Sequence, residues 1–208
     1  MRVLTPTTRL AFVLAFVSVL DASAAPVPVL NTVFPPGGQA GETVEVTVAG
    51  SSLTQVSNLY CSLHGIACQP VKGKTNTFAL TIPKNAPVGQ YDLYAVTKFG
   101  LSSPRAFVIG NRKEIAEAKA DKDEDFPQSV PLDVTINGRI QKGDVDRFSF
   151  TASRGQRVIL ECFAERIDSN LRAMLEVFDS SGRRLAVNRG YFGLDPLIAF
   201  DPPRDGTY

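Results

Sequence analysis

Hydrophobic and polar residues alternate along most of the chain after residue 26. Residues 43–48 read Thr-Val-Glu-Val-Thr-Val, which is the period of a strand with one buried face. Similar runs predict further strands at 78–82, 91–96, 107–109, 147–150, 157–163 and 175–178. Segments rich in Gly, Pro, Ser and Asp predict turns between the strands, at 35–38, 49–52, 87–89, 142–144 and 180–182. Closely spaced strands without alternating helices predict an all-β fold of two tandem antiparallel β-sandwiches.

The first 24 residues follow a different pattern. Arg2 and Arg9 flank a short positive segment, residues 10–20 form an unbroken apolar run, and Ala22-Ser23-Ala24 supplies a small-x-small cleavage motif. The apolar run is well short of the ~20 residues that a membrane-spanning helix needs. The pattern predicts a Sec-type signal peptide over residues 1–24, with an uncleaved anchor as the alternative. We therefore expect a secreted, periplasmic or cell-surface protein with no membrane span after cleavage.

Residues 111–129 interrupt the strand pattern. The segment is rich in charged residues and Ala and poor in β-branched residues, so it could form a turn or two of helix but has almost nothing apolar to bury. It is interpreted as a charged linker between two domains, residues 26–110 and 130–208.

Four segments of the first domain carry a family resemblance. Residues 28–38 read Pro-Val-Leu-Asn-Thr-Val-Phe-Pro-Pro-Gly-Gly and residues 41–50 read Gly-Glu-Thr-Val-Glu-Val-Thr-Val-Ala-Gly. Residues 82–93 read Ile-Pro-Lys-Asn-Ala-Pro-Val-Gly-Gln-Tyr-Asp-Leu, and Phe-Gly-Leu-Ser follows at 99–102. In these segments the domain resembles the IPT/TIG family, which implies an immunoglobulin-like sandwich. Gly41 is expected to permit a tight entrance into the following strand.

The second domain carries its own series of motifs. They include Gly-Asp-Val-Asp-Arg-Phe-Ser-Phe at 143–150, Leu-Glu-Val-Phe-Asp at 175–179, Asp-Pro-Leu-Ile at 195–198 and Asp-Gly-Thr-Tyr at 205–208. This series resembles the bacterial pre-peptidase C-terminal domain, which implies a jelly-roll-like sandwich. Phe148 and Phe150 are expected to point to one face as core anchors. In that family the last motif leads into a final strand, so the domain is expected to be truncated and the chain to be a fragment.

Two cysteines flank the single histidine in Cys-Ser-Leu-His-Gly-Ile-Ala-Cys, residues 61–68. If His64-Gly65 forms a two-residue hairpin turn, Cys61 and Cys68 lie opposite each other with Cα atoms roughly 4.5–5.5 Å apart, which suits a disulfide. An oxidising compartment favours that bond. The alternative is a zinc site of Cys61, His64, Cys68 and Cys162, although Cys162 also fits a buried free thiol.

Acidic residues surround the start of the second domain. Asp123 and Asp125 lie in the linker, and Asp144 and Asp146 lie in the first turn of the domain. Some domains of the pre-peptidase type hold calcium between such a lead-in and the Gly-Asp-x-Asp turn, and carboxylate oxygens suit this ion. The resemblance thus implies a possible calcium site, with a solvated acidic linker as the alternative. No other cofactor is expected.

Charge and motifs narrow the function. The chain has 22 basic and 21 acidic residues, and removal of residues 1–24 leaves 20 of each, so we expect neither nucleic acid nor an anionic membrane as partner. His64 is the only histidine and has no orienting carboxylate nearby in sequence. No phosphate-binding loop or nucleophile elbow is present, so no catalytic residue is assigned and the chain is not expected to be an enzyme.

The sequence therefore predicts a non-catalytic exported multi-domain protein that serves adhesion, substrate binding or positioning at the cell surface. Its partner is expected to be an extracellular protein or polysaccharide that the sequence does not identify. The alternative is the accessory, non-catalytic region of a secreted peptidase or other hydrolase whose catalytic domain lies outside this chain.

Overall fold

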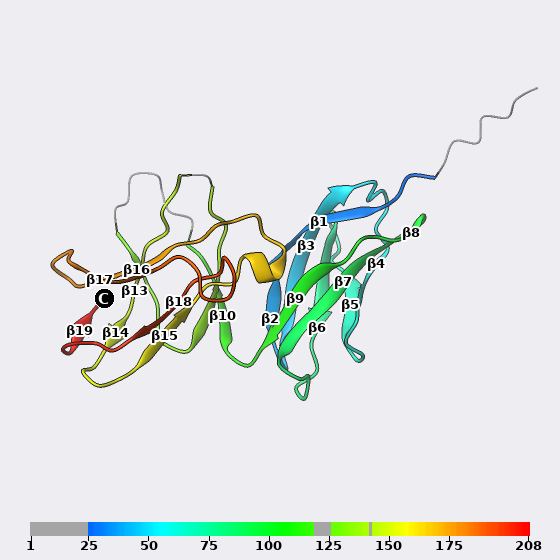
Figure 1. Ribbon diagram of the computed structural model, residues 1–208. Coiled ribbons are helices and arrows are strands. Elements are labelled where there is room, and N and C mark those ends of the chain that lie inside the picture. The colour runs from blue at the N-terminus through cyan, green and yellow to red at the C-terminus, as the bar shows by residue number, and fades with distance from the viewer. Residues whose placement is uncertain (1–24, 119–125, 142) are drawn as a thin grey trace, which may run out of the picture.

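The computed structural model shows two β-domains joined in tandem (Figure 1). It describes residues 25–118, 126–141 and 143–208. Strands dominate both domains and the short 3-10 helix η1 (Glu165–Ile167) lies where they meet, which confirms the all-β class. Within the described ranges, no helix is both long and apolar enough to cross a membrane.

The first domain is a sandwich of two sheets. One sheet has the strand order β1-β3-β6-β5, and the other has the order β2-β9-β7-β4 with β8 added to β7. The strands are β1 (Val29–Phe34), β2 (Gly37–Gln39), β3 (Thr43–Ser51), β4 (Asn58–Cys61), β5 (Ala67–Pro70), β6 (Thr77–Thr81), β7 (Gly89–Thr97), β8 (Gly100–Leu101) and β9 (Arg105–Gly110). All pairings are antiparallel except β2 with β9, which run parallel.

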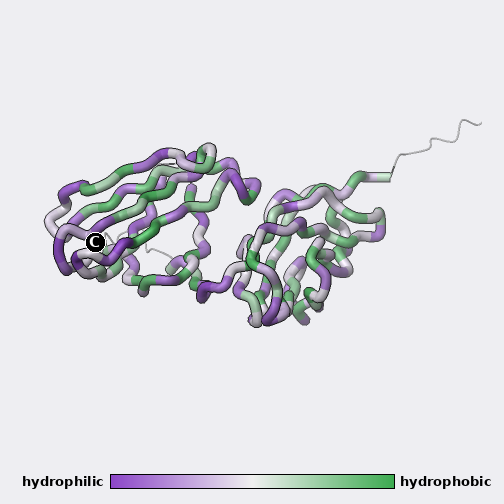
Figure 2. The backbone as a smooth tube through the Cα atoms, turned by 60° about the horizontal axis from the view of Figure 1, so that its bottom comes forward, coloured by the Kyte–Doolittle hydropathy of each residue, from purple (hydrophilic) through white to green (hydrophobic). Residues whose placement is uncertain are grey.

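Alternation along the strands places one set of side chains between these sheets. Val46 and Val48 of β3 are buried while their neighbours Glu45 and Thr47 are exposed, as the period of two predicts. Leu93 of β7 and Phe107 and Ile109 of β9 are fully buried from the opposite sheet. These residues belong to one continuous core, and the alternation is visible as bands of green and purple in Figure 2.

Turns were predicted at two glycines, and the prediction is right at Gly41 and wrong at Gly50. Gly41 has φ +90° and lies just before β3, as expected for a tight turn. Gly50 does not form the predicted turn at 49–52, because β3 continues to Ser51 and pairs with β1. A Cβ at Gly50 would lie 1.9 Å from the carbonyl oxygen of Val29, so glycine is needed here for close strand approach.

The second domain consists of short strand pairs. Its described pairs are β10–β12 and β11–β13, which are parallel, and β14–β19, β15–β18 and β16–β17, which are antiparallel. Their bounds are β10 (Lys113–Ala116), β11 (Gln128–Ser129), β12 (Val134–Asn137), β13 (Phe148–Ser149), β14 (Thr151–Ala152), β15 (Val158–Glu161), β16 (Leu175–Phe178), β17 (Arg184–Asn188), β18 (Leu197–Phe200) and β19 (Gly206–Thr207).

Three aromatic rings form the centre of this smaller core. The ring centroid of Phe150 lies 6.4 Å from that of Phe200 and 6.1 Å from that of Tyr208, and the latter two rings are 4.9 Å apart. Phe150 is therefore a core anchor as predicted. Phe148 is not, because it lies in the separate short strand β13 and remains half-buried outside the cluster.

Part of the predicted linker is a strand instead of a helical turn. Residues 113–116 form β10 in parallel register with β12, so that Ile115 lies beside Ile136. Asn137 donates a hydrogen bond to the Glu114 carboxylate at 2.5 Å. Pairing with the second domain thus overrides the helical propensity of this charged segment.

Candidate functional site

One side chain joins the two domains through a backbone hydrogen bond. Asp168, the residue after η1, has φ +62°, and its Oδ2 accepts a hydrogen bond from the backbone N–H of Ala106 in β9 at 2.8 Å. Two residues later, the N–H of Val108 donates to Pro36, but β2 begins only at Gly37. Residues two apart in a strand point their N–H groups the same way, so Asp168 satisfies an edge donor that β2 does not reach.

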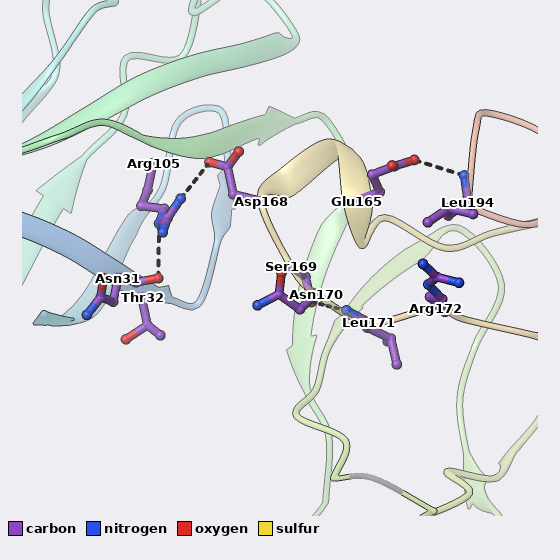
Figure 3. Close-up of a pocket in the computed structure, with 10 residues that line it drawn as sticks. All are labelled: Asn31, Thr32, Arg105, Glu165, Asp168, Ser169, Asn170, Leu171, Arg172 and Leu194. Carbon is purple, nitrogen blue, oxygen red and sulfur yellow. Dashed lines mark hydrogen bonds and ion pairs between the residues drawn. The ribbon is translucent and has the colours of Figure 1, made fainter.

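Charged side chains support this contact. Arg105 Nη1 lies 3.9 Å from Asp168 Oδ2, and Arg105 Nε donates to the carbonyl oxygen of Asn31 at 3.0 Å (Figure 3). On another part of the junction, the guanidinium of Arg139 lies 4.0 Å from the ring centroid of Phe34. A hydrogen bond to a charged group contributes about 1.5–3 kcal/mol, whereas a partly exposed ion pair contributes up to about 1 kcal/mol. Asp168 is accordingly the principal polar contact between the domains.

A buried carboxylate determines where η1 lies. Asp195 is fully buried, and its two oxygens accept hydrogen bonds from the backbone N–H groups of Ala164, Glu165 and Arg166 at 3.1, 2.7 and 3.2 Å. The Arg166 side chain adds a fourth, from Nε at 2.8 Å. Burial alone would raise the pKa of Asp195, but these hydrogen bonds outweigh it and hold that pKa below its ordinary value. Asp195 therefore remains charged and fixes the start of η1.

The Arg166 guanidinium is held on all sides. It donates to the carboxylate of Glu161 at 2.8 Å and to the carbonyl oxygen of Cys162 at 3.1 Å. The rings of Phe163 and Phe192 lie over it, with centroids 4.0 and 4.5 Å from its central carbon. We name Asp195 and Arg166, with these surrounding groups, the Asp195–Arg166 network.

The junction contains a cleft of about 720 Å³ that is open to solvent. Its lining comes from β1 and β9 of the first domain and from η1 and nearby loops of the second: Asn31, Thr32, Arg105, Glu165, Asp168, Ser169, Asn170, Leu171, Arg172 and Leu194 (Figure 3). Glu165 Oε2 accepts a hydrogen bond from the Leu194 N–H at 2.9 Å, which ties the loop before β18 to η1. The wall of the cleft is thus built from segments far apart in sequence.

The lining of the cleft is polar. Arg105 and Arg172 balance Glu165 and Asp168, so the lining carries no net charge. Ser169 Oγ accepts a hydrogen bond from the N–H of Leu171 at 3.2 Å, and neither His nor Cys lies among the described lining residues. What the cleft does offer is side chains without partners among the described residues, including the Thr32 hydroxyl, the Asn170 amide and the Arg172 guanidinium.

The predicted calcium ligands are only partly described. Asp123 and Asp125 lie outside the described residues, while Asp144 and Asp146 are exposed. Partial desolvation, followed by repulsion from Glu117 and then Asp144, raises the pKa of Asp146 to about 6. In the described part of the chain, no three His, Cys, Asp or Glu side chains are arranged to hold a metal ion. The calcium site stays a prediction.

The predicted hairpin between Cys61 and Cys68 is wrong. Cys61 ends β4 and pairs in register with Leu93, whereas Cys68 lies in β5 and pairs with Leu80 of the other sheet. The intervening turn thus crosses between the sheets instead of joining two neighbours. Burial raises the pKa of both thiols, and both side chains contact the same core. A disulfide between them stays a prediction.

The zinc alternative is also wrong. His64 is exposed in the turn between β4 and β5, and Cys162 is half-buried in the second domain beside the Asp195–Arg166 network. All four proposed ligands are described, and no three of them are grouped in a way that could hold a metal. Cys61 and Cys68 contact the core of the first domain, His64 is exposed, and Cys162 belongs to the second domain.

Sequence reasoning missed the cleft residues. Asp168, Asn31 and Arg105 belong to three distant segments with no periodic pattern. One local signal was present: Glu-Arg-Ile-Asp-Ser-Asn at 165–170 is a polar run after a strand, and Asp tolerates the left-handed conformation that Asp168 adopts. That signal indicates a turn but not the partner across the junction.

Comparison with known proteins identifies the first domain. Residues 28–108 match the model of the IPT/TIG domain. These residues form an IPT/TIG domain. The match covers β1 to β8 and most of β9, so the IPT/TIG domain contributes Asn31, Thr32 and Arg105 to the cleft.

The chain is also similar to one protease sequence and to one solved structure. A probable subtilase-type serine protease of Deinococcus radiodurans is 41% identical over 66 residues, which is 31% of this chain and 9% of the length of the protease. The solved structure of SGBP-B from the mixed-linkage glucan utilization locus of Bacteroides ovatus, in complex with a mixed-linkage heptasaccharide, aligns with a TM-score of 0.32 and 11% identity. That alignment covers 83% of this chain and 35% of the other.

Proposed function

We propose that this chain is a non-catalytic, exported module pair that binds an extracellular ligand, protein or polysaccharide, and positions it at the cell surface. A Sec-type signal peptide over residues 1–24 and a second domain of the bacterial pre-peptidase C-terminal type complete the proposal. The observation that carries it is the hydrogen bond from the Ala106 N–H to Asp168, because this bond holds the two domains around a preformed cleft.

A preformed cleft favours binding for an energetic reason. A ligand that bridges two freely moving domains must also order them, which weakens its affinity. Asp168 and the Arg139–Phe34 contact reduce that freedom before the ligand arrives, and the Asp195–Arg166 network holds in place η1, the helix that Asp168 follows. Unpaired polar side chains in the wall then supply direction-specific contacts.

The test is a binding screen of the purified chain against arrays of soluble polysaccharides and extracellular matrix proteins. We expect at least one ligand whose affinity falls about tenfold in Asn170→Ala/Arg172→Ala, equivalent to one strong polar contact. Arg154→Ala is the matched control, because Arg154 is an exposed arginine of the same domain that does not line the cleft. A ligand that binds both variants equally well would contradict the role of the cleft.

Asp168→Ala separates positioning from direct contact. Loss of this carboxylate removes the Ala106 hydrogen bond and the Arg105 ion pair together. We expect a broader distribution of distances between the domains by small-angle X-ray scattering and weaker binding, with each domain still unfolding cooperatively. An unchanged scattering profile would show that other contacts hold the cleft.

A second candidate is favoured by the 66-residue match to the subtilase-type protease. In that case the module pair is an accessory region that positions substrate for a catalytic domain outside this chain. An antibody against this chain should then detect a larger species in the producing cells that a fluorophosphonate serine-hydrolase probe also labels. Absence of labelling on every species detected would exclude a serine-protease partner in the same polypeptide.

A further inference from the structure

The outer face of the β2-β9-β7-β4 sheet carries an apolar surface where polar side chains are expected. Leu93 and Ala95 of β7 point into the core, so Tyr94 and Val96 point outward. Tyr60 of β4 is the register partner of Tyr94, and Leu101 of β8 is the register partner of Val96. Paired residues share a face, so these four side chains form one surface, which we name the tyrosine face.

The two tyrosines form the centre of this face. Tyr60 is 47% exposed, and its ring centroid lies 6.0 Å from that of Tyr94 with the rings tilted by 44°. Tyr94 Oη donates a hydrogen bond to Asp92 Oδ2 at 3.4 Å. Desolvation and the nearby Asp92 charge raise the pKa of Tyr94, so its phenol keeps the proton. The face thus combines exposed ring surface with a hydroxyl and a carboxylate at its border.

The tyrosine face continues an interface that is already occupied. Asp92 pairs in register with Ala106, and Ala106 is only 5% exposed because η1 and Asp168 of the second domain lie against it. The second domain therefore covers the β9 side of the sheet and leaves β7 and β4 open. Leu101 of β8, which lies on the same side of β7 as β9 but further along that strand, is 53% exposed. Contiguous exposed apolar surface of this kind is typical of interaction sites.

We propose that the tyrosine face binds a neutral polysaccharide, as a second site distinct from the cleft. The apolar C–H face of a pyranose ring packs on a tyrosine ring, and its hydroxyl groups need polar partners at the border, here Tyr94 Oη, the Asp92 carboxylate and the Asn58 amide. Charge on this part of the sheet is limited to Asp92 and to Lys98, whose Nζ lies 4.9 Å from the Phe99 ring centroid. These opposite charges balance, which suits an uncharged chain of sugars better than an anionic polymer.

Affinity electrophoresis of the full chain tests this proposal, in native gels that contain mixed-linkage β-glucan, xylan, galactomannan or dextran. At least one of these polysaccharides should retard the wild-type chain. Tyr60→Ala/Tyr94→Ala should lose about tenfold or more in affinity, equivalent to the loss of aromatic packing. Tyr60→Phe/Tyr94→Phe keeps both rings and should retain most of the retardation. Tyr191→Ala, which removes a 63% exposed tyrosine of the second domain, is the matched control.

Each result separates the tyrosine face from the cleft. Retardation that the tyrosine variant abolishes and Asn170→Ala/Arg172→Ala preserves supports the proposal. Retardation that only the cleft variant abolishes overturns it and leaves the proposed function intact. Retardation by none of the four polysaccharides also overturns it. Sedimentation velocity tests whether a second copy of the chain covers this face instead. A wild-type dimer that becomes a monomer in the tyrosine variant would show such an interface and would overturn the polysaccharide proposal. Thermal unfolding of each variant confirms that it folds.

Discussion

The two domains reach an ordered structure by different means. The IPT/TIG domain has two multi-stranded sheets whose buried side chains form one continuous apolar core. The second domain is described as pairs of short strands around a smaller core, and its loops are organised by the buried Asp195 carboxylate and the Arg166 guanidinium. Apolar packing tolerates the loss of a single polar contact, whereas a buried ionic network does not. The residues that shape the cleft come mostly from the second kind of structure.

The largest expected effect is in the core of the IPT/TIG domain. Phe107→Ala removes a fully buried ring and should lower the free energy of unfolding of that domain by about 3–5 kcal/mol. Differential scanning calorimetry should show the transition of the IPT/TIG domain at lower temperature, with the second transition little changed. Equal shifts of both transitions would mean that the domains unfold as one unit.

In the second domain, the corresponding substitution removes a buried charge, whereas Phe107→Ala removes a buried ring. Asp195→Ala leaves Arg166 and three backbone N–H groups without their acceptor, and should lower the free energy of unfolding by about 3 kcal/mol. Asp195→Asn keeps one acceptor oxygen and replaces the other with an NH₂ group, so its effect should be intermediate. Both changes are measured by calorimetry, with Asp201→Ala as the control for an exposed carboxylate paired with Arg157. An effect no larger than that of the control would contradict the importance of the network.

A disulfide would make the contrast between the domains greater. If Cys61 and Cys68 become joined in an oxidising compartment, the closed loop should stabilise the IPT/TIG domain by about 2 kcal/mol. Reductant should then lower the first transition, and thiol titration of the unfolded, oxidised chain should find Cys162 alone. Titration of all three cysteines would exclude the bond.

The smallest effect concerns the carboxylates at the start of the second domain. Because the folded-state pKa of Asp146 is raised to about 6, the folded state binds its proton more tightly than the unfolded state, whose pKa is near 3.9. This contribution is fully present below about pH 4 and is lost as the pH rises through 6. Glu117→Gln removes one repulsive charge, so the melting temperature should fall less between pH 4.5 and 7.5 than in wild type. Glu42→Gln in the first domain should leave the pH profile unchanged.

Calcium addresses the same region directly. If Asp144 and Asp146 bind the ion together with Asp123 and Asp125, calcium should raise the melting temperature of the second domain and a chelator should reverse the change. An identical transition in both conditions would leave the acidic segment as a solvated spacer.

The local sequence pattern correctly predicted elements whose conformation depends mainly on their own residues. The alternation in residues 43–48 is sufficient to predict β3, and Gly41 adopts the positive φ of a turn glycine. The pattern gave the wrong prediction where a segment could pair with either of two neighbouring strands. The segment at 61–68 fits a hairpin or a crossing between sheets equally well, and only the pairing of β5 with β6 decides. Residues 113–116 likewise become a strand because β12 is available.

The cleft lay beyond such reasoning for the same physical cause. Its walls depend on contacts between Asn31, Arg105 and Asp168. More than sixty residues separate Asn31 from Arg105 and Arg105 from Asp168, and Asp168 belongs to the other domain. The motif at 195–198 carries a family resemblance, but nothing in its sequence indicates that Asp195 is buried and accepts hydrogen bonds from three successive backbone N–H groups. Tertiary proximity, not local composition, creates the site.

The contact between Asp168 and Ala106 has a consequence for how such modules evolve. Asp168 recognises a main-chain N–H, which every amino acid except proline provides, so substitutions along β9 do not erase the recognition. The sequence of the first domain can therefore diverge, or the domain can be exchanged for another of the same fold, while Asp168 still forms this hydrogen bond. What the contact requires is a main-chain N–H at position 106 and an acidic side chain at the residue that follows η1. A junction of this kind lets a chain acquire new binding surfaces without redesigning how its parts are joined.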